Sequence, residues 1–355
     1  MQLKYRDSDS IFSKVYYDKD KNRFEITSSV DNSEIYYYPT LKLDNSYAVE
    51  HFSYKLLYNK SSCENSIYQV YVGEDRIGWI FPIQALLSSN HDYANDEYFL
   101  KYAYVATYLL LRDINQTDKI DFPQEFMLND YIDDVKCILV LDYENIARIK
   151  DFNISDYTVG LFKYGYQYKD VGDFKSSDIK SKNKLKICPL AKELRGNPSI
   201  NDLFVEQFML ASNAVIKFHI CYQIIELLIS KVFEHKFRLI IDKLSDNPEE
   251  LFDLREDLSK ITAEKERVKC LFEDYTKCET CDKTDIGIAC KNFLDLNGKK
   301  TSDNFYYNLY SVRCMLVHKL YAVNQESHKY LNDINDHLLN IVMDMLFSFH
   351  FPQDN

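Results

Sequence analysis

The chain has 355 residues, of which 28% are charged, and a formal net charge of −12. That length is enough for two domains with sizeable hydrophobic cores. The acidic balance argues against a protein that coats duplex nucleic acid, because such a protein needs a basic face, but it is compatible with an enzyme that has one local positive cleft.

The beginning of the chain predicts strands. It opens on the polar run MQLKYRDSDS, which is unlike a signal peptide, so we expect a cytoplasmic protein. The runs RFEITS, EIYYYPTLKL and HFSYKLLY alternate or cluster residues that favour strands. Two further strands are expected near Ile67–Val72 and Arg76–Phe81, joined as a hairpin by the turn Gly73-Glu74-Asp75.

A helix and two more strands complete the first half. The run NDEYFLKYAYVATYLLLRDI has a helical pattern, with Asn95 as its expected N-cap and acidic residues in its first turn. KCILVL (Lys136–Leu141) and YTVGLFKYGYQY (Tyr157–Tyr168) again favour strands. Residues 1–185 are therefore predicted to form a mixed, strand-rich domain.

A polar and locally basic segment, Phe174–Ser199, follows, and we place the domain boundary within it, near residue 190. Two interpretations are open. Lysine runs are usually solvated linkers. The alternative is the positive rim that an acidic RNA-binding enzyme would need. The candidate RNA-binding residues on this rim are Lys180, Lys182, Lys184 and Lys186.

The rest of the chain, residues 190–350, predicts helices. A long helix is expected over residues 201–242, and its most apolar part, Ala214–Phe233, carries enough charged and polar residues to argue against a membrane span. Pro248 suits the first turn of a highly charged surface helix that is expected to end near Leu271. A cysteine-bearing loop and two more helices are expected after it.

The segment YSVRCMLVHKLY, Tyr310–Tyr321, is apolar except for Arg313 and His318. Five residues on an α-helix correspond to a rise of about 7.5 Å and a rotation of about 140°, so the two side chains do not stack but can both reach one groove across the helix. An unpaired buried guanidinium costs several kcal/mol. The two residues are thus either a structural ion pair and a packed histidine, or the polar lining of a cleft.

An earlier apolar helix carries Tyr222, Gln223 and Glu226. A carboxylate on a helix with the composition of a buried one needs a partner for its charge. A helix with Tyr-Gln-x-x-Glu followed by a later helix with Arg313-x4-His318 resembles the HEPN superfamily of α-helical domains. The Arg-x4-6-His motif is the ribonuclease signature of that superfamily. The resemblance covers about residues 190–350 and leaves the first half unexplained.

The resemblance implies a metal-independent endoribonuclease that acts as a homodimer or higher homo-oligomer with facing motifs. Arg313 would stabilise the phosphate, His318 would transfer protons, Glu226 would orient one of them, and Tyr222 would support the site. Histidine suits proton transfer near neutral pH, and the fork-shaped guanidinium suits phosphate oxygens. The family often has Asn, Asp or His after the arginine, whereas this chain has Cys314. That departure puts the strength or substrate alignment of the activity in doubt.

The chain is therefore predicted to be α+β: a strand-rich sensor or regulatory domain (1–185), then an all-α HEPN-like bundle (190–350) with a cysteine-bearing insertion near 245–295. The resemblance suggests antiviral abortive-infection defence, RNA such as tRNA as substrate, and a phage protein as trigger. The alternative is a non-catalytic dimerisation or nucleotide-binding module in a protein-sensing adaptor, without a membrane partner. His219, on the apolar helix, is interpreted as a packed histidine.

Four of the nine cysteines fall in one window. Cys278-x2-Cys281 is a knuckle that can hold zinc, and Cys270 and Cys290 are the nearest further ligands. The spacing is not the symmetric double knuckle of a zinc ribbon. A structural zinc and a set of unliganded reduced thiols are therefore both open interpretations, and no cofactor is expected for catalysis.

Overall fold

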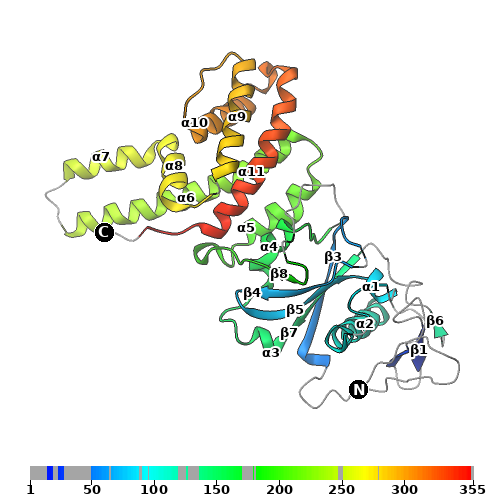
Figure 1. The fold of residues 1–355 in the computed structure, drawn as a ribbon. Helices are drawn as coiled ribbons and strands as arrows, with labels where there is room; N and C mark the ends of the chain where they lie inside the picture. The colour runs from blue at the N-terminus through cyan, green and yellow to red at the C-terminus, as the bar shows by residue number, and fades with distance from the viewer. Residues whose placement is uncertain are drawn as a thin grey trace. The chain divides into compact units, whose positions relative to one another are not determined.

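The computed structural model describes residues 14–18, 23–27, 49–63, 65–87, 90–94, 96–118, 125–126, 136–169, 179, 181–246, 251–278 and 280–352. It divides into two compact units (Figure 1). Unit 1 comprises Met1–Ile154 and Gly160–Cys188, and unit 2 comprises Ser155–Val159 and Pro189–Asn355. The described strands all lie in unit 1, and the described elements of unit 2 are helical, so the α+β prediction is confirmed. The predicted strand at 34–43 and the positions Asn95, Lys180 and Pro248 lie outside the described residues.

The main sheet of unit 1 has the strand order β3-β7-β5-β4-β8. All neighbouring strands run antiparallel except β4 and β8, which run parallel. A smaller sheet has the order β2-β1-β6. The strands are β1 (Lys14–Asp18), β2 (Arg23–Thr27), β3 (Phe52–Tyr58), β4 (Tyr68–Val72), β5 (Asp75–Pro82), β6 (Glu125–Phe126), β7 (Lys136–Asp142) and β8 (Lys184–Lys186). The predicted hairpin is confirmed as β4 and β5, and Gly73 has a φ of 61° in its turn.

Strands β5 and β7 are central because their side chains are apolar on both faces, as strands buried from both sides require. One face packs against α2 (Glu97–Asp118), as Figure 1 shows. Trp79 lies at the middle of this core, with the rings of Tyr93, Phe99 and Tyr102 against it. The helix α2 was predicted, and its cap is Asp96, whose Oδ1 accepts a hydrogen bond from the amide of Phe99 at 2.8 Å.

The prediction of a strand over Tyr157–Tyr168 is wrong, because the segment forms the helix α4 (Thr158–Lys163) and then a turn at Gly165, whose φ is 87°. A Cβ at Gly160 would lie 2.5 Å from the carbonyl oxygen of Cys188, so α4 packs directly on backbone there. Within this segment, Gln167 alone forms a β-bridge, which is antiparallel and joins it to Tyr58. Tertiary packing thus overrides the strand propensity of these residues. The other short helices of this region are α1 (Gln84–Leu87) and α3 (Tyr143–Ile146).

The core of unit 2 is built from α6, α9, α10 and α11, in which α9 packs against both α10 and α11, and α11 packs against α6 (Figure 1). Its helices are α5 (Pro198–Asn201), a π-helical turn (Asp202–Phe208), α6 (Ala214–Asp246), α7 (Leu251–Thr262), α8 (Glu264–Cys270), a second π-helical turn (Leu271–Tyr275), α9 (Thr280–Leu296), α10 (Phe305–His318) and α11 (His328–Ser348).

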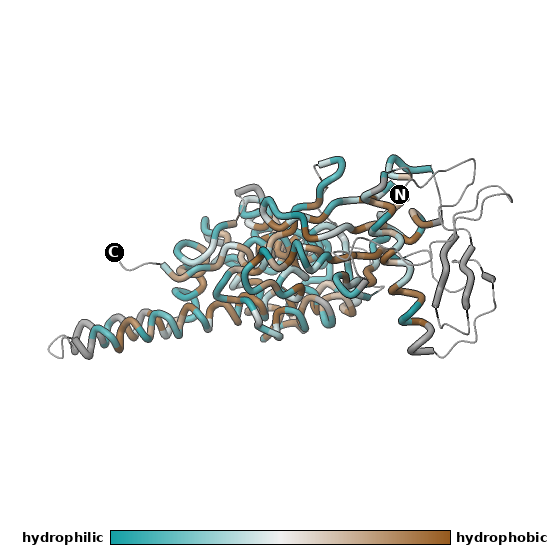
Figure 2. The backbone as a smooth tube through the Cα atoms, turned by 90° about the horizontal axis from the view of Figure 1, so that it is seen from below, coloured by the Kyte–Doolittle hydropathy of each residue, from teal (hydrophilic) through white to brown (hydrophobic). Residues whose placement is uncertain are grey.

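The single helix predicted over residues 201–242 is interrupted at residues 211–213, and α6 then runs as one long helix. The cause is Asn213, whose Oδ1 accepts a hydrogen bond from the amide of Ile216 at 2.9 Å and so begins a new helix. Figure 1 shows α6 and α7 side by side as a projecting pair, and Figure 2 shows polar and apolar residues alternating along this projection. No helix in the described part of the chain is both long enough and apolar enough to cross a bilayer.

The expected cysteine-bearing loop is instead largely helix α9, which is a correction to the sequence prediction. Ile286, Cys290, Phe293 and Leu294 are buried at helical spacing. A Cβ at Gly287 would lie 3.3 Å from Cβ of Phe305, so the glycine lets α9 approach the start of α10. The charged helix predicted to run to Leu271 also ends earlier, and α8 starts anew after Ala263.

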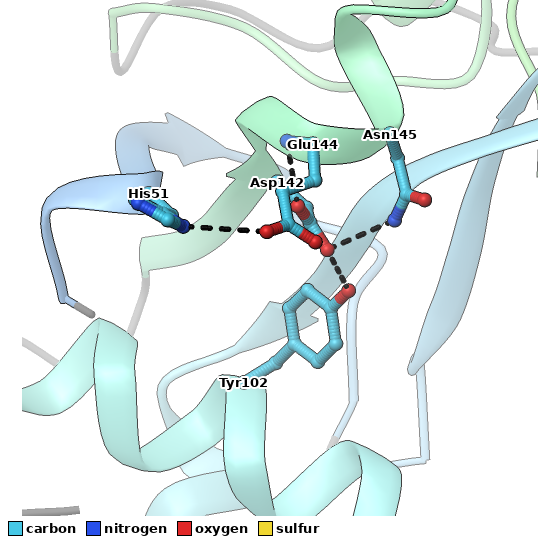
Figure 3. A network of polar contacts seen from close by, with 5 residues as sticks. All are labelled: His51, Tyr102, Asp142, Glu144 and Asn145. Carbon is cyan, nitrogen blue, oxygen red and sulfur yellow. Dashed lines mark hydrogen bonds and ion pairs between the residues drawn. The ribbon is translucent and has the colours of Figure 1, made fainter. Parts of the chain in front are cut away.

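A buried carboxylate organises the end of β7 in unit 1 (Figure 3). Asp142 is 4% exposed and accepts hydrogen bonds from Tyr102 Oη at 2.8 Å, from the amide of Glu144 at 3.0 Å and from Asn145 Nδ2 at 2.9 Å. The side chain therefore joins α2, β7 and α3, and it caps α3.

We expect Asp142→Ala to lower the free energy of unfolding of unit 1 by about 2 kcal/mol, because the Tyr102 hydroxyl would stay buried without its acceptor. The single tryptophan, Trp79, reports this unit, so urea unfolding followed by tryptophan fluorescence measures the change. The exposed Asp75→Ala is the control, with an expected change below about 0.5 kcal/mol. Equal unfolding midpoints for the two variants would contradict the role of Asp142.

Candidate functional site

Two helices of unit 2 bring two predicted site residues, Arg313 and Glu226, into contact. Arg313 on α10 donates from Nη2 to Oε1 of Glu226 on α6 at 2.7 Å. The side chains are 19% and 41% exposed, respectively, so the ion pair lies at the edge of the helix interface rather than in its core. The pair joins residues 87 positions apart in sequence, and it orients the guanidinium.

The ring of Tyr222 lies beneath this ion pair. Arg313 Cζ is 5.7 Å from the ring centroid, a cation–π geometry, and the ring stacks on Phe218 at 5.9 Å. Tyr222 is 2% exposed, and its hydroxyl has no hydrogen-bond partner in the described part of the chain. Burial, followed by the charge of Glu264, raises the pKa of Tyr222 well above its usual value. Tyr222 therefore stays protonated near neutral pH.

A second carboxylate faces the same guanidinium from α8. Burial opposes the charge on Arg313, but the hydrogen bond and charge of Glu226, together with the charge of Glu264, outweigh it and raise the arginine pKa. Glu264 Oε2 also accepts a hydrogen bond from Tyr310 Oη at 3.4 Å. Arg313 is thus held between acids from two different helices and remains fully charged.

Cys314, the residue that departs from the family pattern, lies half-buried beside this cluster. Burial, and then a hydrogen bond with the Cys314 side chain, raises the pKa of Tyr310 to about 12. Tyr310 and Cys314 are one helical turn apart on α10, so the contact is local. The thiol of Cys314 therefore influences Tyr310, which also donates a hydrogen bond to Glu264.

Sequence reasoning missed His219 as a member of this cluster, because it was interpreted as a packed histidine. The side chain is half-buried, and burial, then the charge of Arg313, lower its pKa, while Glu226 partly opposes that change. His219 is therefore neutral near pH 7. The spacing of positions 219, 222 and 226 on α6, three and then four residues apart, was the available signal, since it places them on one helix face.

His318 is the last residue of α10 and is exposed to solvent. Within the described residues its side chain forms no hydrogen bond and no ion pair, so a single chain does not join it to Arg313. Three exposed apolar side chains lie close to it in sequence: Val317 (44% exposed), Leu320 (47%) and Tyr321 (90%).

The lysines predicted as an RNA-binding rim belong to unit 1. Lys184 and Lys186 are exposed on β8, so this part of the basic segment is a strand of the sheet and not a solvated linker. Lys186 Nζ is 2.6 Å from Oε1 of Glu74, and Lys184 Nζ lies 5.1 Å from the ring centroid of Tyr71. Both side chains are thus engaged within unit 1.

Lys182 is also engaged, because its Nζ is 3.1 Å from Oδ2 of Asp92. Both side chains are strongly exposed, and exposed ion pairs of this kind contribute about 0–1 kcal/mol. The fourth predicted lysine, Lys180, lies outside the described residues. The described lysines therefore do not form an unpaired basic rim.

The described cysteines of the predicted zinc site have different surroundings. Cys270 Sγ is 2.8 Å from Lys236 Nζ, Cys278 is half-buried in the segment between the second π-helical turn and α9, and Cys290 is fully buried in α9. Burial raises the pKa of Cys278 to about 11. The side chain of Cys281 is outside the described part. Among the described side chains, no group of three or more His, Cys, Asp or Glu residues could hold a metal ion.

The sequence was compared with protein-family models, with curated proteins and with solved structures, and none of these comparisons found a match.

Proposed function

We propose that unit 2 is a metal-independent endoribonuclease of the HEPN type. The observation that carries the proposal is the ion pair between Arg313 and Glu226 above the ring of Tyr222, on two neighbouring helices. These are the residues that the family resemblance assigns to one site. A charged arginine, oriented by a carboxylate and seated on an aromatic ring, is suited to the crowded phosphate of a cleavage transition state.

The proposed reaction uses the nucleophile that RNA itself carries. The 2′-oxygen attacks the phosphorus, the bond from phosphorus to the 5′-oxygen breaks, and a 2′,3′-cyclic phosphate and a 5′-hydroxyl result. A base takes the proton of the 2′-hydroxyl and an acid protonates the leaving 5′-oxygen. His318 supplies the proton transfer, because its exposed side chain is free of partners within the described residues.

A homodimer completes the proposed site. One chain places His318 and Arg313 about 140° apart on α10. The apolar side chains of Val317, Leu320 and Tyr321 beside His318 are exposed, which is the composition expected of a surface that a second copy covers. In the dimer, two arginines and two histidines share one RNA cleft. Unit 1 regulates this activity in antiviral abortive-infection defence, with tRNA as a candidate substrate and a phage protein as the trigger.

One observation favours a second candidate function. Arg313 already has carboxylates of Glu226 and Glu264 on its sides, which is what a structural ion pair requires. A non-catalytic dimerisation or nucleotide-binding module in a protein-sensing adaptor would retain such a pair. Cleavage assays separate the two functions, because only the nuclease loses product formation when the pair is altered.

We expect Glu226→Gln to lower the rate of RNA cleavage about 10- to 100-fold, because the neutral amide no longer holds the guanidinium by charge. Glu226 is 41% exposed, so the expected loss of stability is below about 1 kcal/mol. Labelled-RNA cleavage and thermal melts of the same preparation measure both quantities. Glu234→Gln, at an exposed position on the same helix, is the matched control. A lower melting temperature with unchanged cleavage would favour the structural interpretation.

A further inference from the structure

A polar pocket of about 300 Å³ lies in unit 1 where the β4–β5 turn meets α3. Every side chain that lines it is polar or charged. The lining residues are Tyr71, Glu74, Asp75, Arg76, Asn145 and Arg148. None of them was singled out as a site residue from the sequence. A small pocket without aliphatic walls is unsuited to an apolar ligand, so its charges decide what it can bind.

Two guanidinium groups face this pocket. Arg76 is half-buried, and its Cζ lies 5.8 Å from the ring centroid of Tyr102. Arg148 is exposed, just after α3. Neither arginine forms an ion pair within the described residues. The register of the hairpin shifts beside Tyr71, which pairs with Arg76, and this irregularity sets the position of the arginine at the pocket.

Among the side chains that line the pocket, the arginines outnumber the carboxylates that lack an ion pair. Glu74 is paired with Lys186 at 2.6 Å, and the hydrogen bond and charge of that lysine lower the glutamate pKa. Asp142 is not part of the lining; it is buried and accepts hydrogen bonds from Tyr102, from the amide of Glu144 and from Asn145. Asp75 is the lining carboxylate that has no ion pair in the described part of the chain. Two guanidinium groups thus face one uncompensated acid.

The supporting network holds the pocket in shape before any ligand arrives. Figure 3 shows Asp142 contacting both Tyr102, the ring below Arg76, and Asn145, a residue of the lining. Glu144 contributes its amide to the same carboxylate and its side chain to His51, at 3.5 Å. A pre-formed arrangement reduces the entropy that binding has to overcome.

We propose that this pocket binds the phosphate or diphosphate group of a small molecule. A planar guanidinium group can donate two parallel hydrogen bonds to two oxygens of one phosphate. These charge-assisted hydrogen bonds are stronger than hydrogen bonds between neutral groups. The volume lies at the lower end of the range for ligand pockets and suits a compact anion. The inference rests on unit 1 alone and does not depend on the proposed nuclease.

The experiment is calorimetric titration of inorganic pyrophosphate into the full chain and three variants. We expect wild type to bind, Arg148→Gln to bind about tenfold more weakly, and Asp75→Asn to bind about threefold more tightly, because each change alters the charge of the lining by one unit. Lys150→Gln removes an exposed cation two residues from Arg148 but outside the lining, and is expected to bind within twofold of wild type.

The opposite signs at Arg148 and Asp75 separate a local charge effect from general unfolding, which would weaken binding in both variants. Citrate serves as a polycarboxylate probe of similar charge and is expected to bind at least tenfold more weakly than pyrophosphate. The proposal is overturned by absence of pyrophosphate binding to wild type, by equal affinities of wild type and Arg148→Gln, or by citrate binding as tightly as pyrophosphate.

Discussion

His318→Ala is expected to lower the rate of RNA cleavage by about a thousandfold, because a positioned acid or base contributes about 10²- to 10⁴-fold to a proton-transfer reaction. The side chain is exposed and has no hydrogen bond or ion pair within the described residues, so its removal changes the free energy of unfolding by less than about 0.5 kcal/mol. Single-turnover cleavage of end-labelled RNA measures the rate, and thermal melts measure the stability.

His328→Ala is the matched control for this experiment, because His328 is also exposed and begins the next long helix. We expect this control to cleave within twofold of wild type. Unchanged cleavage by His318→Ala would remove His318 from the mechanism. His219 would then be the next group to test, since it is neutral near pH 7 and lies close enough to Arg313 to sense its charge.

Gly78→Ala is expected to destabilise unit 1 by at least about 3 kcal/mol, at the upper end of the costs of overpacking. A Cβ on Gly78 would lie 1.8 Å from the carbonyl oxygen of Val140 and 2.9 Å from its carbonyl carbon. Those atoms belong to β7, and β5 and β7 are hydrogen-bonded in register at this point. Neither strand can move away without breaking the centre of the sheet.

Gly73→Ala provides the comparison that isolates this clash. Gly73 has open space around its Cα but a φ of 61°, so its substitution carries a backbone cost of about 1 kcal/mol and no steric overlap. Urea unfolding followed by the fluorescence of Trp79 compares both variants with wild type. Similar losses in the two variants would show that the sheet can absorb the added methyl group.

The elements that could be predicted from sequence are those with strong local signals. The hairpin β4–β5 has its turn residues, β7 is a continuous apolar run, and α2 combines helical periodicity with an acidic start. That Glu226 would orient Arg313 or His318 was expected from the family resemblance, and the structure pairs it with Arg313.

The errors share a physical cause, which is packing between segments distant in sequence. The β-forming residues around Val159 and Leu161 become helical because Gly160 packs against the backbone of Cys188. The segment expected to be a cysteine-bearing loop is largely helix α9, where Gly287 permits the close approach of Phe305. The pKa of His219 is likewise lowered by burial and then by the charge of Arg313 on another helix, and no local sequence pattern reports either effect.

The pocket of unit 1 is the clearest case of a feature hidden from sequence reasoning. Its lining comes from the β4–β5 turn and from α3, which are about seventy residues apart, and no motif links them. Its arginines look like ordinary surface charges until the ion pairing of their neighbours is known. Lys186, which was predicted from the sequence to contact RNA, forms an ion pair with Glu74 in the lining of this pocket.

The most direct test of the proposed nuclease is end-group analysis of RNA fragments produced by the purified protein in EDTA, beside Arg313→Lys and His318→Ala. The account predicts fragments with 2′,3′-cyclic phosphate and 5′-hydroxyl ends from wild type, and at least hundredfold less product from both folded variants. Cleavage that requires an added divalent metal, or that continues at the wild-type rate in both variants, would contradict it.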